Sequence, residues 1–312
     1  MEKIKTGYTP VKHRLREWFH PFRLLTLLAT AVILLMLFLV VGQVLWKGLD
    51  HLSWSFIANS PGEDITSGGI FPAIFGTAAM VLMMTVVVVP MGVITAVYLT
   101  EYAKENKLTR IIRLGVNNLA GVPPIVFGLF GVGFFINFIG KGFIDPVFFP
   151  GETVYGKEAI IWASLTLALL TLPVVIIATE EALKNIPKEL REGSAALGAR
   201  KYQTIIRLVL PNAQSGILTG AILAVSRGAG EVAPILLTGI AYYTTELPEN
   251  LSDKFIELGY QLYSMVTNSA NNDQAEPVFF ATALVMLTLT FTLNILAILL
   301  RYHFRKKIKK YS

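Results

Sequence analysis

Two oppositely charged residues, Arg227 and Glu231, interrupt an otherwise apolar stretch over residues 213–243. An ionised side chain in hydrocarbon costs from roughly 2.5 to well over about 10 kcal/mol, so such a pair should face protein or water. A spacing of four residues places both side chains on one face of a helix, beside the thin backbone of Gly228 and Gly230. The pair is therefore a candidate part of a polar pathway. The alternative is an internal ion pair that only neutralises itself.

The composition places this pair in a membrane protein. Of the 312 residues, 54% are hydrophobic and only 15% are charged, whereas a typical soluble protein has about 25% charged residues. Five charge-free stretches each exceed the roughly 20 residues of a spanning helix; they cover residues 24–46, 65–100, 114–140, 159–179 and 277–300. A further span over 213–240 carries only the Arg227/Glu231 pair. The sequence thus predicts an all-α integral membrane protein with six transmembrane helices.

The basic residues predict how these spans are oriented, because short cytoplasmic loops are enriched in Lys and Arg. With the N-terminus inside, nearly all of the 27 basic residues fall on the cytoplasmic side, and the exceptions are Lys47, Lys141, Lys157 and Lys254 outside and Arg227 within the membrane. Both termini are therefore predicted to be cytoplasmic. The net charge of +6 is an orientation signal that favours contact with anionic membrane lipid over binding of nucleic acid.

The chain divides into four predicted parts. These are a cytoplasmic N-terminal segment over residues 1–23, a first transmembrane helix over 24–46, a transmembrane domain over 70–302 that includes a cytoplasmic loop at 180–211, and a basic cytoplasmic tail over 303–312. The outside loop over 244–276 is acidic. We expect it to be a solvated surface loop with a short amphipathic helix within residues 251–266.

The loop at 180–211 contains the most specific local pattern. Pro187 is followed by Lys188 and Glu189, as is typical of a helix start. Gly198 supplies a stop, because glycine adopts the left-handed closing conformation without strain. A second helix is predicted over residues 199–210, ending before Pro211. The loop is therefore predicted to be a helix-turn-helix elbow on the cytoplasmic face.

This elbow resembles the motif of permease subunits of bacterial ABC importers, in which Glu-Ala-Ala, three residues, Gly, nine residues, Ile, one residue and Leu-Pro follow one another. The spacing holds here, with Gly and Ser in place of the two alanines and Leu208 in place of isoleucine. The resemblance implies a type I ABC importer permease fold in which the elbow is the coupling helix that docks in a groove of the ATPase subunit. The residues that carry it are Glu192, Gly193, Ser194, Gly198, Leu210 and Pro211.

Three further segments, over residues 67–77, 121–128 and 226–234, resemble the A-type permeases of bacterial phosphate importers. That resemblance implies that Arg227 and Glu231 act in the transport pathway for inorganic phosphate and that the chain is a multi-pass protein of the bacterial inner membrane. It also implies a set of partners. These are a second, homologous permease that forms a heterodimer with this chain, a dimer of ATP-binding subunits, and an extracytoplasmic phosphate-binding protein.

The chain itself offers no site for catalysis or for a cofactor. It contains no phosphate-cradling Gly-x4-Gly-Lys-Ser/Thr motif, so ATP and Mg²⁺ are expected on the partner ATPase. The sequence has no cysteine, its four histidines lie outside the predicted spans, and no span holds an aspartate; no metal site or intramembrane hydrolase is expected. Two alternatives remain: a permease of an importer for another oxyanion, sulfate or molybdate, and a secondary transporter that works without ATPase partners.

Overall fold

The structure is a computed structural model of the whole chain, and it describes residues 21–62, 68–241, 245–268 and 275–309. Most of the predicted N-terminal segment, Ser67 of the first permease-like segment, Asp273 of the acidic loop and the last residues of the basic tail lie outside these ranges.

The described residues are mostly helical, with turns and irregular loops between the helices, and their β structure is confined to two isolated bridges. The order of elements is α2 (Pro21–Leu49), α3 (Trp54–Ala58), α4 (Phe71–Val97), η1 (Tyr98–Tyr102), α5 (Lys107–Leu119), α6 (Pro124–Phe130), η2 (Gly131–Ile144), α7 (Asp145–Phe148), α8 (Ile160–Lys184), α9 (Lys188–Ala196), α10 (Lys201–Thr204), η3 (Ile205–Val209), α11 (Leu210–Gly228), η4 (Ile235–Leu237), α12 (Leu258–Asn268) and α13 (Ala275–Lys309). Of the η elements, η1, η2 and η3 are π-helical and η4 is a 3₁₀ turn.

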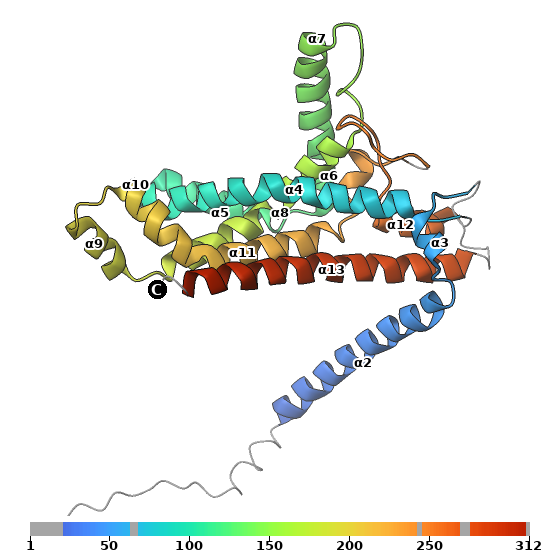
Figure 1. The fold of residues 1–312 in the computed structure, drawn as a ribbon, viewed down its shortest axis with the longest axis horizontal. Coiled ribbons are helices and arrows are strands. Elements are labelled where there is room, and N and C mark those ends of the chain that lie inside the picture. The colour runs from blue at the N-terminus through green and yellow to red at the C-terminus, as the bar shows by residue number, and fades with distance from the viewer. Residues whose placement is uncertain (1–20, 63–67, 242–244, 269–274, 310–312) are drawn as a thin grey trace, which may run out of the picture.

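Six helical segments of the described chain are long and apolar enough to cross a membrane, which confirms the predicted number of spans. They are Arg23–Leu49, Phe71–Tyr102, Pro124–Phe148, Ile160–Lys184, Lys201–Gly228 and Ala275–His303. In Figure 1, α4, α8, α11 and α13 run together, α9 and α10 lie at one end of this bundle, and the third span projects from it toward α7. At the other end lie α3 and α12.

Helix α8 is the centre of this bundle. In the most apolar stretch of α8, 67% of the residues are buried inside the chain, whereas none of the most apolar stretch of α2 is buried. Its neighbours on either side are α4 and α11. Gly216 and Gly220 form the packing face of α11: a methyl group added at Gly216 would lie within clashing distance of Ala182, and one at Gly220 would lie 3.0 Å from Ala178. Small residues thus bring α11 close to α8.

Two predicted spans are placed wrongly by the charge-free stretches. The third span begins at Pro124 and not at residue 114, because the chain breaks after α5 at the Pro123–Pro124 pair. The fifth span runs over Lys201–Gly228, because charged residues such as Arg207 do not end a helix, whereas glycines and Pro234 do. The absence of charge therefore located the spans but not their ends.

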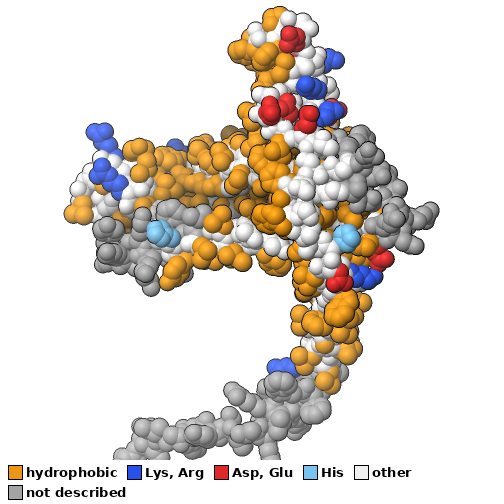
Figure 2. All heavy atoms as spheres, turned by 45° about the vertical axis from the view of Figure 1, so that its right-hand side comes forward, with side chains coloured by type: hydrophobic (Ala, Val, Ile, Leu, Met, Phe, Trp, Pro, Cys, Tyr) orange, Lys and Arg blue, Asp and Glu red, His pale blue; other side chains and the backbone are white. Residues whose placement is uncertain are grey.

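The first span stands apart from the others. In Figure 1, α2 leaves one end of the bundle and points away from it. Its contact with the bundle is at its C-terminal end, where Gly48 lies against the backbone of Phe280 and Lys47 pairs with Glu276. Hydrophobic side chains cover α2 and the length of the bundle in Figure 2, while Lys and Arg side chains gather at the end formed by α9 and α10. An apolar outer surface of this kind suits a lipid environment.

Candidate functional site

Arg227 and Glu231 meet at the end of α11. Arg227 lies in the last turn of the helix, and its Nε is 3.3 Å from Oε1 of Glu231. The prediction that both residues are helical is wrong for Glu231, which follows the end of α11. The two side chains are 35% and 21% exposed. The pair is thus half-buried and joined by one long contact, and much of the guanidinium remains open.

Close packing fixes the turn that follows Arg227. A methyl group at Gly228 would lie 2.6 Å from Sδ of Met84 in α4, and one at Gly128 in α6 would lie 2.8 Å from the carbonyl oxygen of Pro234. A side chain at Gly128 would therefore meet backbone, whereas one at Gly228 would meet the flexible end of Met84, and the segment after α11 lies close to both α4 and α6. The turn that presents Glu231 is built into the bundle.

A second polar contact at this level was not predicted from the sequence. Ser226 Oγ lies 2.5 Å from Oδ1 of Asn294 in the sixth span, so a hydrogen bond joins α11 to α13 beside Arg227. An amide within a charge-free span is the signal that points to it, because a polar side chain in hydrocarbon needs a partner. Ser226 thereby fixes the end of α11 next to the ion pair.

The elbow consists of α9, a turn at Gly198 and α10. Gly198 has φ +82°, which confirms its predicted left-handed stop. Ser194 Oγ lies 2.9 Å from Oγ1 of Thr204 and ties the two arms together. None of the residues of α9 is buried, and Leu197 at the tip is 91% exposed. Glu192 and Gly193 are also exposed, so the elbow presents a free surface.

The second arm of the elbow does not end before Pro211 as predicted. The chain passes from α10 through η3 into α11, and Pro211 occupies the first turn of α11 next to Leu210. Proline lacks a backbone donor, but a first helical turn does not need one. Asn212 Nδ2 donates to the carbonyl oxygen of Leu208 at 2.7 Å and satisfies one exposed acceptor of this junction. The helical rod from Lys201 to Gly228 therefore connects the elbow directly to Arg227.

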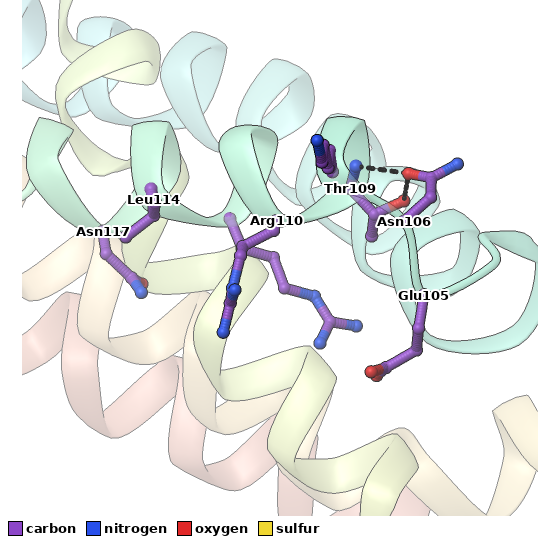
Figure 3. A pocket seen from close by; sticks show the side chains of 8 residues that line it. Glu105, Asn106, Thr109, Arg110, Leu114 and Asn117 are labelled. Carbon is purple, nitrogen blue, oxygen red and sulfur yellow. Dashed lines mark hydrogen bonds between the residues drawn. The ribbon is translucent and has the colours of Figure 1, made fainter.

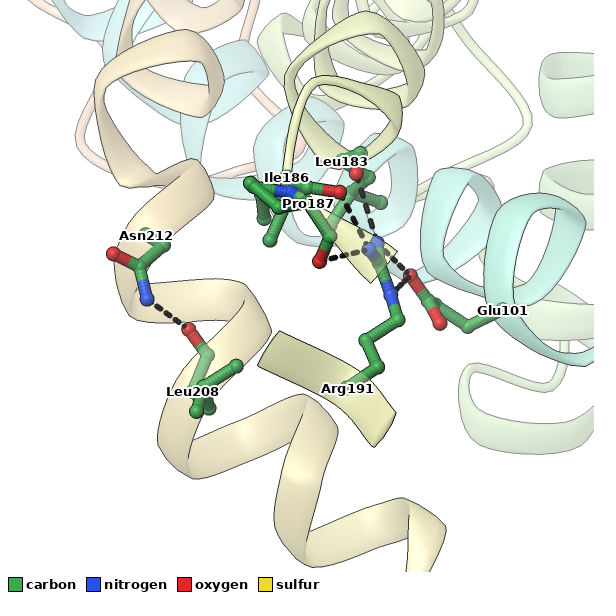
Figure 4. A network of polar contacts seen from close by, with 7 residues as sticks. All are labelled: Glu101, Leu183, Ile186, Pro187, Arg191, Leu208 and Asn212. Carbon is green, nitrogen blue, oxygen red and sulfur yellow. Dashed lines mark hydrogen bonds and ion pairs between the residues drawn. The ribbon is translucent and has the colours of Figure 1, made fainter. Parts of the chain in front are cut away.

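Arg191 anchors the elbow to the bundle, and sequence reasoning missed it (Figure 4). Its Nη2 donates to Oε1 of Glu101 in η1 at 2.7 Å and to the carbonyl oxygen of Leu183 at 2.9 Å. Its Nη1 donates to the carbonyl oxygen of Ile186 at 2.7 Å. The side chain of Glu101 is only 9% exposed. One guanidinium thus closes the end of α8 and links α9 to the second span.

The acidic loop also departs from its prediction. Glu257 is fully buried and not solvated, and its carboxylate accepts hydrogen bonds from the backbone N–H groups of Gly259 and Tyr260, both at 2.8 Å. Leu258 N–H donates to Thr77 Oγ1 of α4 at 3.0 Å. Burial raises the pKa of Glu257 to about 7, against the lowering effect of these two hydrogen bonds. The carboxylate caps α12, whose start at Leu258 lies later than the predicted one.

Residues 88–310 match the family described as the binding-protein-dependent transport system inner membrane component. The chain belongs to this family. It is 33% identical over 236 residues to the phosphate transport system permease protein PstA 1 of Mycobacterium tuberculosis (strain ATCC 25618 / H37Rv), covering 76% of this chain and 70% of that protein. It is also 33% identical over 211 residues to the probable ABC transporter permease protein YqgI of Bacillus subtilis (strain 168), covering 68% and 67%. The resemblance to ABC importer permeases is thereby confirmed.

Solved structures support the same fold at lower identity. A chain of the bacterial alginate ABC transporter, solved with an alginate-bound periplasmic protein, has a TM-score of 0.64 at 15% identity and covers 92% of this chain and 94% of its own. A chain of the inward-facing MetNI methionine ABC transporter has a TM-score of 0.53 at 17% identity, with coverages of 74% and 94%. The chain is therefore a multi-pass inner membrane permease subunit of an ABC transport system, and its family comprises transport subunits and not enzymes.

The two predicted groups of residues lie at opposite ends of one rod. The elbow residues lie at its start, where Leu210 and Pro211 form the junction with α11, and Arg227 lies at its end. The structure therefore does not bring the two groups together into one site. It connects them through 28 residues of helix.

Proposed function

We propose that this chain forms half of the translocation pathway for inorganic phosphate in an ATP-driven importer. The observation that carries the proposal is the loose Arg227–Glu231 pair at the end of the rod that begins at the elbow. Among the relatives, those from Mycobacterium tuberculosis and Yersinia pestis bear the name of phosphate transport system permease proteins. Within the pair, Arg227 supplies the positive charge that suits such a substrate.

Arg227 provides the counter-charge for the anion. A planar guanidinium donates forked hydrogen bonds to tetrahedral oxyanions and stays charged at any working pH. Among the residues that the structure describes, Glu231 engages only Nε, at 3.3 Å, which leaves the two Nη groups for the phosphate oxygens. Glu231 repels the anion unless it is paired with Arg227 or protonated, and we assign it the role of holding Arg227 until substrate passes.

The elbow is the proposed contact with the ATPase. Its exposed tip combines the carboxylate of Glu192 with the apolar side chain of Leu197, which suits insertion into a groove. Gly198 forms its turn, and Gly193 and Ser194 lie in α9 next to Glu192. Movement of the ATPase subunits is transmitted through the Leu210–Pro211 junction to the end of α11, which gives alternating access by domain rocking.

The remaining partners and the placement in the membrane follow from the same proposal. The chain pairs with a second, homologous permease in a heterodimer, two ATPase subunits bind ATP and Mg²⁺, and an extracytoplasmic binding protein delivers phosphate. The described residues contain no cluster that fits a metal ion. Both termini are cytoplasmic in this arrangement. The division into segments 1–23, 24–46, 70–302 and 303–312 remains a prediction.

Uptake of radiolabelled phosphate tests the proposal. The chain and its partners are expressed in cells that lack their own phosphate importers, and uptake is measured with and without excess sulfate or molybdate. We expect accumulation that depends on the ATPase and is unaffected by either competitor. Suppression by sulfate or molybdate would identify the substrate as another oxyanion, and accumulation without the ATPase would identify a secondary transporter.

The elbow is tested separately by copurification. Replacing Leu197 with Asp places a charge on the exposed apolar tip without touching the bundle, because this side chain is 91% exposed. We expect the variant to insert normally and to lose the ATPase during purification. Full retention of the ATPase together with normal uptake would contradict the proposal that the elbow couples the chain to the ATPase.

A further inference from the structure

Helix α5 carries a charged face that neither the pathway nor the elbow uses. Its apolar residues Leu108, Ile111 and Ile112 lie on one side and are exposed. Its other side lines a hollow of about 610 Å³ (Figure 3). The lining residues are Glu105, Asn106, Lys107, Thr109, Arg110, Arg113, Leu114 and Asn117. A phosphate group, alone or with the rest of a headgroup, is small enough for this volume.

The cations that line this hollow outnumber its carboxylates. Lys107, Arg110 and Arg113 follow one another at intervals of three residues, and Glu105 is the one acidic residue of the lining. Like charges on neighbouring turns of a helix repel one another. An anion bound between them would relieve this repulsion. The lining of the hollow therefore carries more positive than negative charge, and a bound anion would balance it.

The three cations differ in how they are held. Arg113 is fixed, since its Nη2 donates to the carbonyl oxygen of Leu99 at 2.8 Å and its Nε faces Glu180 at 3.8 Å without a hydrogen bond. Arg110 and Lys107 have no side-chain hydrogen bond or ion pair to any residue of the described ranges. Figure 3 shows Arg110 and Glu105 both directed into the space beneath α5. Arg110 is thus a free forked donor beside a fixed one.

A second, smaller hollow of about 190 Å³ continues toward α8 and shares Arg113 and Asn117 with the first. Its acidic residue Glu180 is already engaged by Lys184 at 2.8 Å. The remaining carboxylate on this wall, Glu181, faces the same hollow. The positive character therefore concentrates on the α5 side, at Lys107 and Arg110, with the amide of Asn117 as a neutral donor next to them.

We propose that the hollow beneath α5 binds a phosphate group, with Arg110 and Lys107 as its charged donors and Asn117 as a neutral one. A guanidinium and an ammonium on adjacent helical turns match a tetrahedral oxyanion, with the guanidinium giving a forked pair of hydrogen bonds and the ammonium acting as a point charge. The group comes either from free inorganic phosphate or from the headgroup of an anionic phospholipid. The first source rests on the proposed transport of phosphate, and the second does not.

The test uses the full-length chain in nanodiscs and carries the Arg227→Gln substitution throughout, so that the pathway site does not contribute. In phosphatidylcholine nanodiscs, binding of radiolabelled inorganic phosphate is measured by equilibrium dialysis. In phosphatidylglycerol nanodiscs, retained lipid is counted by native mass spectrometry. Each measurement compares Arg110→Gln with Lys104→Gln, a matched loss of one exposed positive charge close to the hollow but outside its lining.

We expect Arg110→Gln to weaken phosphate binding, or to reduce retained phosphatidylglycerol, at least tenfold, and Lys104→Gln to change either by less than twofold. Loss of phosphate binding in phosphatidylcholine identifies free phosphate as the ligand. Loss of retained phosphatidylglycerol, with no phosphate bound, identifies the headgroup. Equal effects of the two substitutions in both measurements would overturn the proposal. That result would leave phosphate uptake intact as a function, and suppression of uptake by sulfate would refute the function without changing these binding data.

Discussion

Two Arg–Glu pairs of this chain have the same chemistry and opposite surroundings. Arg191 donates to Glu101 at 2.7 Å and to two backbone carbonyl oxygens at 2.7 and 2.9 Å, at the junction of α9 with the bundle. Within the described ranges, the side chain of Arg227 has one polar contact, to Glu231 at 3.3 Å, at the far end of α11. With several fixed partners, the guanidinium of Arg191 holds two elements together. With one partner, the guanidinium of Arg227 can exchange that partner for an incoming anion.

This comparison assigns different measurements to the two pairs. Loss of a multiply bonded arginine leaves buried acceptors without donors, so it should lower stability. Loss of a singly bonded, half-exposed arginine should leave stability almost unchanged, because such ion pairs contribute about 0–1 kcal/mol. Its effect should instead appear in transport.

The largest expected effect is that of Arg227→Gln on uptake. Hydrogen bonds to a charged group contribute about 1.5–3 kcal/mol, which corresponds to a loss of about 10- to 100-fold in phosphate uptake. Uptake is measured in membranes with a matched amount of protein. Arg227→Lys keeps the positive charge but loses the forked pair of donors, so its phosphate uptake should lie between that of the native chain and that of Arg227→Gln. Near-normal phosphate uptake by Arg227→Gln would show that Arg227 has no role in the pathway and that the two Arg–Glu pairs do not differ in function.

Arg191→Ala should destabilise the protein by about 2 kcal/mol, because Glu101 and the carbonyl oxygens at the end of α8 lose their shared donor. The measurement is thermal unfolding in detergent, alongside Arg227→Gln as the matched loss of an arginine. We expect a lower Tm for Arg191→Ala only. Equal Tm values for the two variants would show that the number of contacts does not distinguish the pairs.

Glu257 extends the comparison with Glu101 and Glu231, because among the described residues its carboxylate accepts hydrogen bonds from backbone N–H groups and not from an arginine. Burial raises its pKa to about 7, so the folded state favours the neutral acid. The resulting stabilisation is complete below the pKa of the unfolded chain and is lost as the pH rises through about 7. Between pH 6 and pH 8 the loss amounts to about 1 kcal/mol.

The measurement compares thermal unfolding of the native chain and of Glu257→Gln at the two pH values. The amide cannot titrate, so the variant should lack this part of the pH dependence. A parallel pH response of both proteins would mean that Glu257 stays ionised in the folded state, held by the N–H groups of Gly259 and Tyr260.

The smallest effect is expected at Gly193, on the same short helix as Arg191. No atom lies within 4 Å of a methyl group added there, and glycine within a helix is less stable than alanine by about 0.5–1 kcal/mol. Gly193→Ala should therefore stabilise α9 slightly, as measured by Tm. Gly216→Ala is the contrasting control, because its methyl group would clash with Ala182. A destabilised Gly193→Ala would indicate that α9 is more closely packed than its exposure implies.

Local patterns predicted the elements of the fold and the residues of the site, but long-range contacts determined their geometry. The number of spans followed from apolar length, and the stop at Gly198 followed from glycine chemistry. The ends of the third and fifth spans could not be predicted from the charge-free stretches, because prolines and glycines end those helices and charged residues do not. Arg191 and Glu257 could not be found from sequence, since their roles depend on partners or burial set by distant segments.

The continuity of the helix between Lys201 and Gly228 has a geometric consequence for gating. At about 1.5 Å per residue, this element is roughly 40 Å long. A tilt of about 5° around its midpoint would displace each tip by about 2 Å, which exceeds the tolerance of a hydrogen bond. A swing of this size that moved Arg227 relative to Glu231 would therefore break the 3.3 Å contact between them.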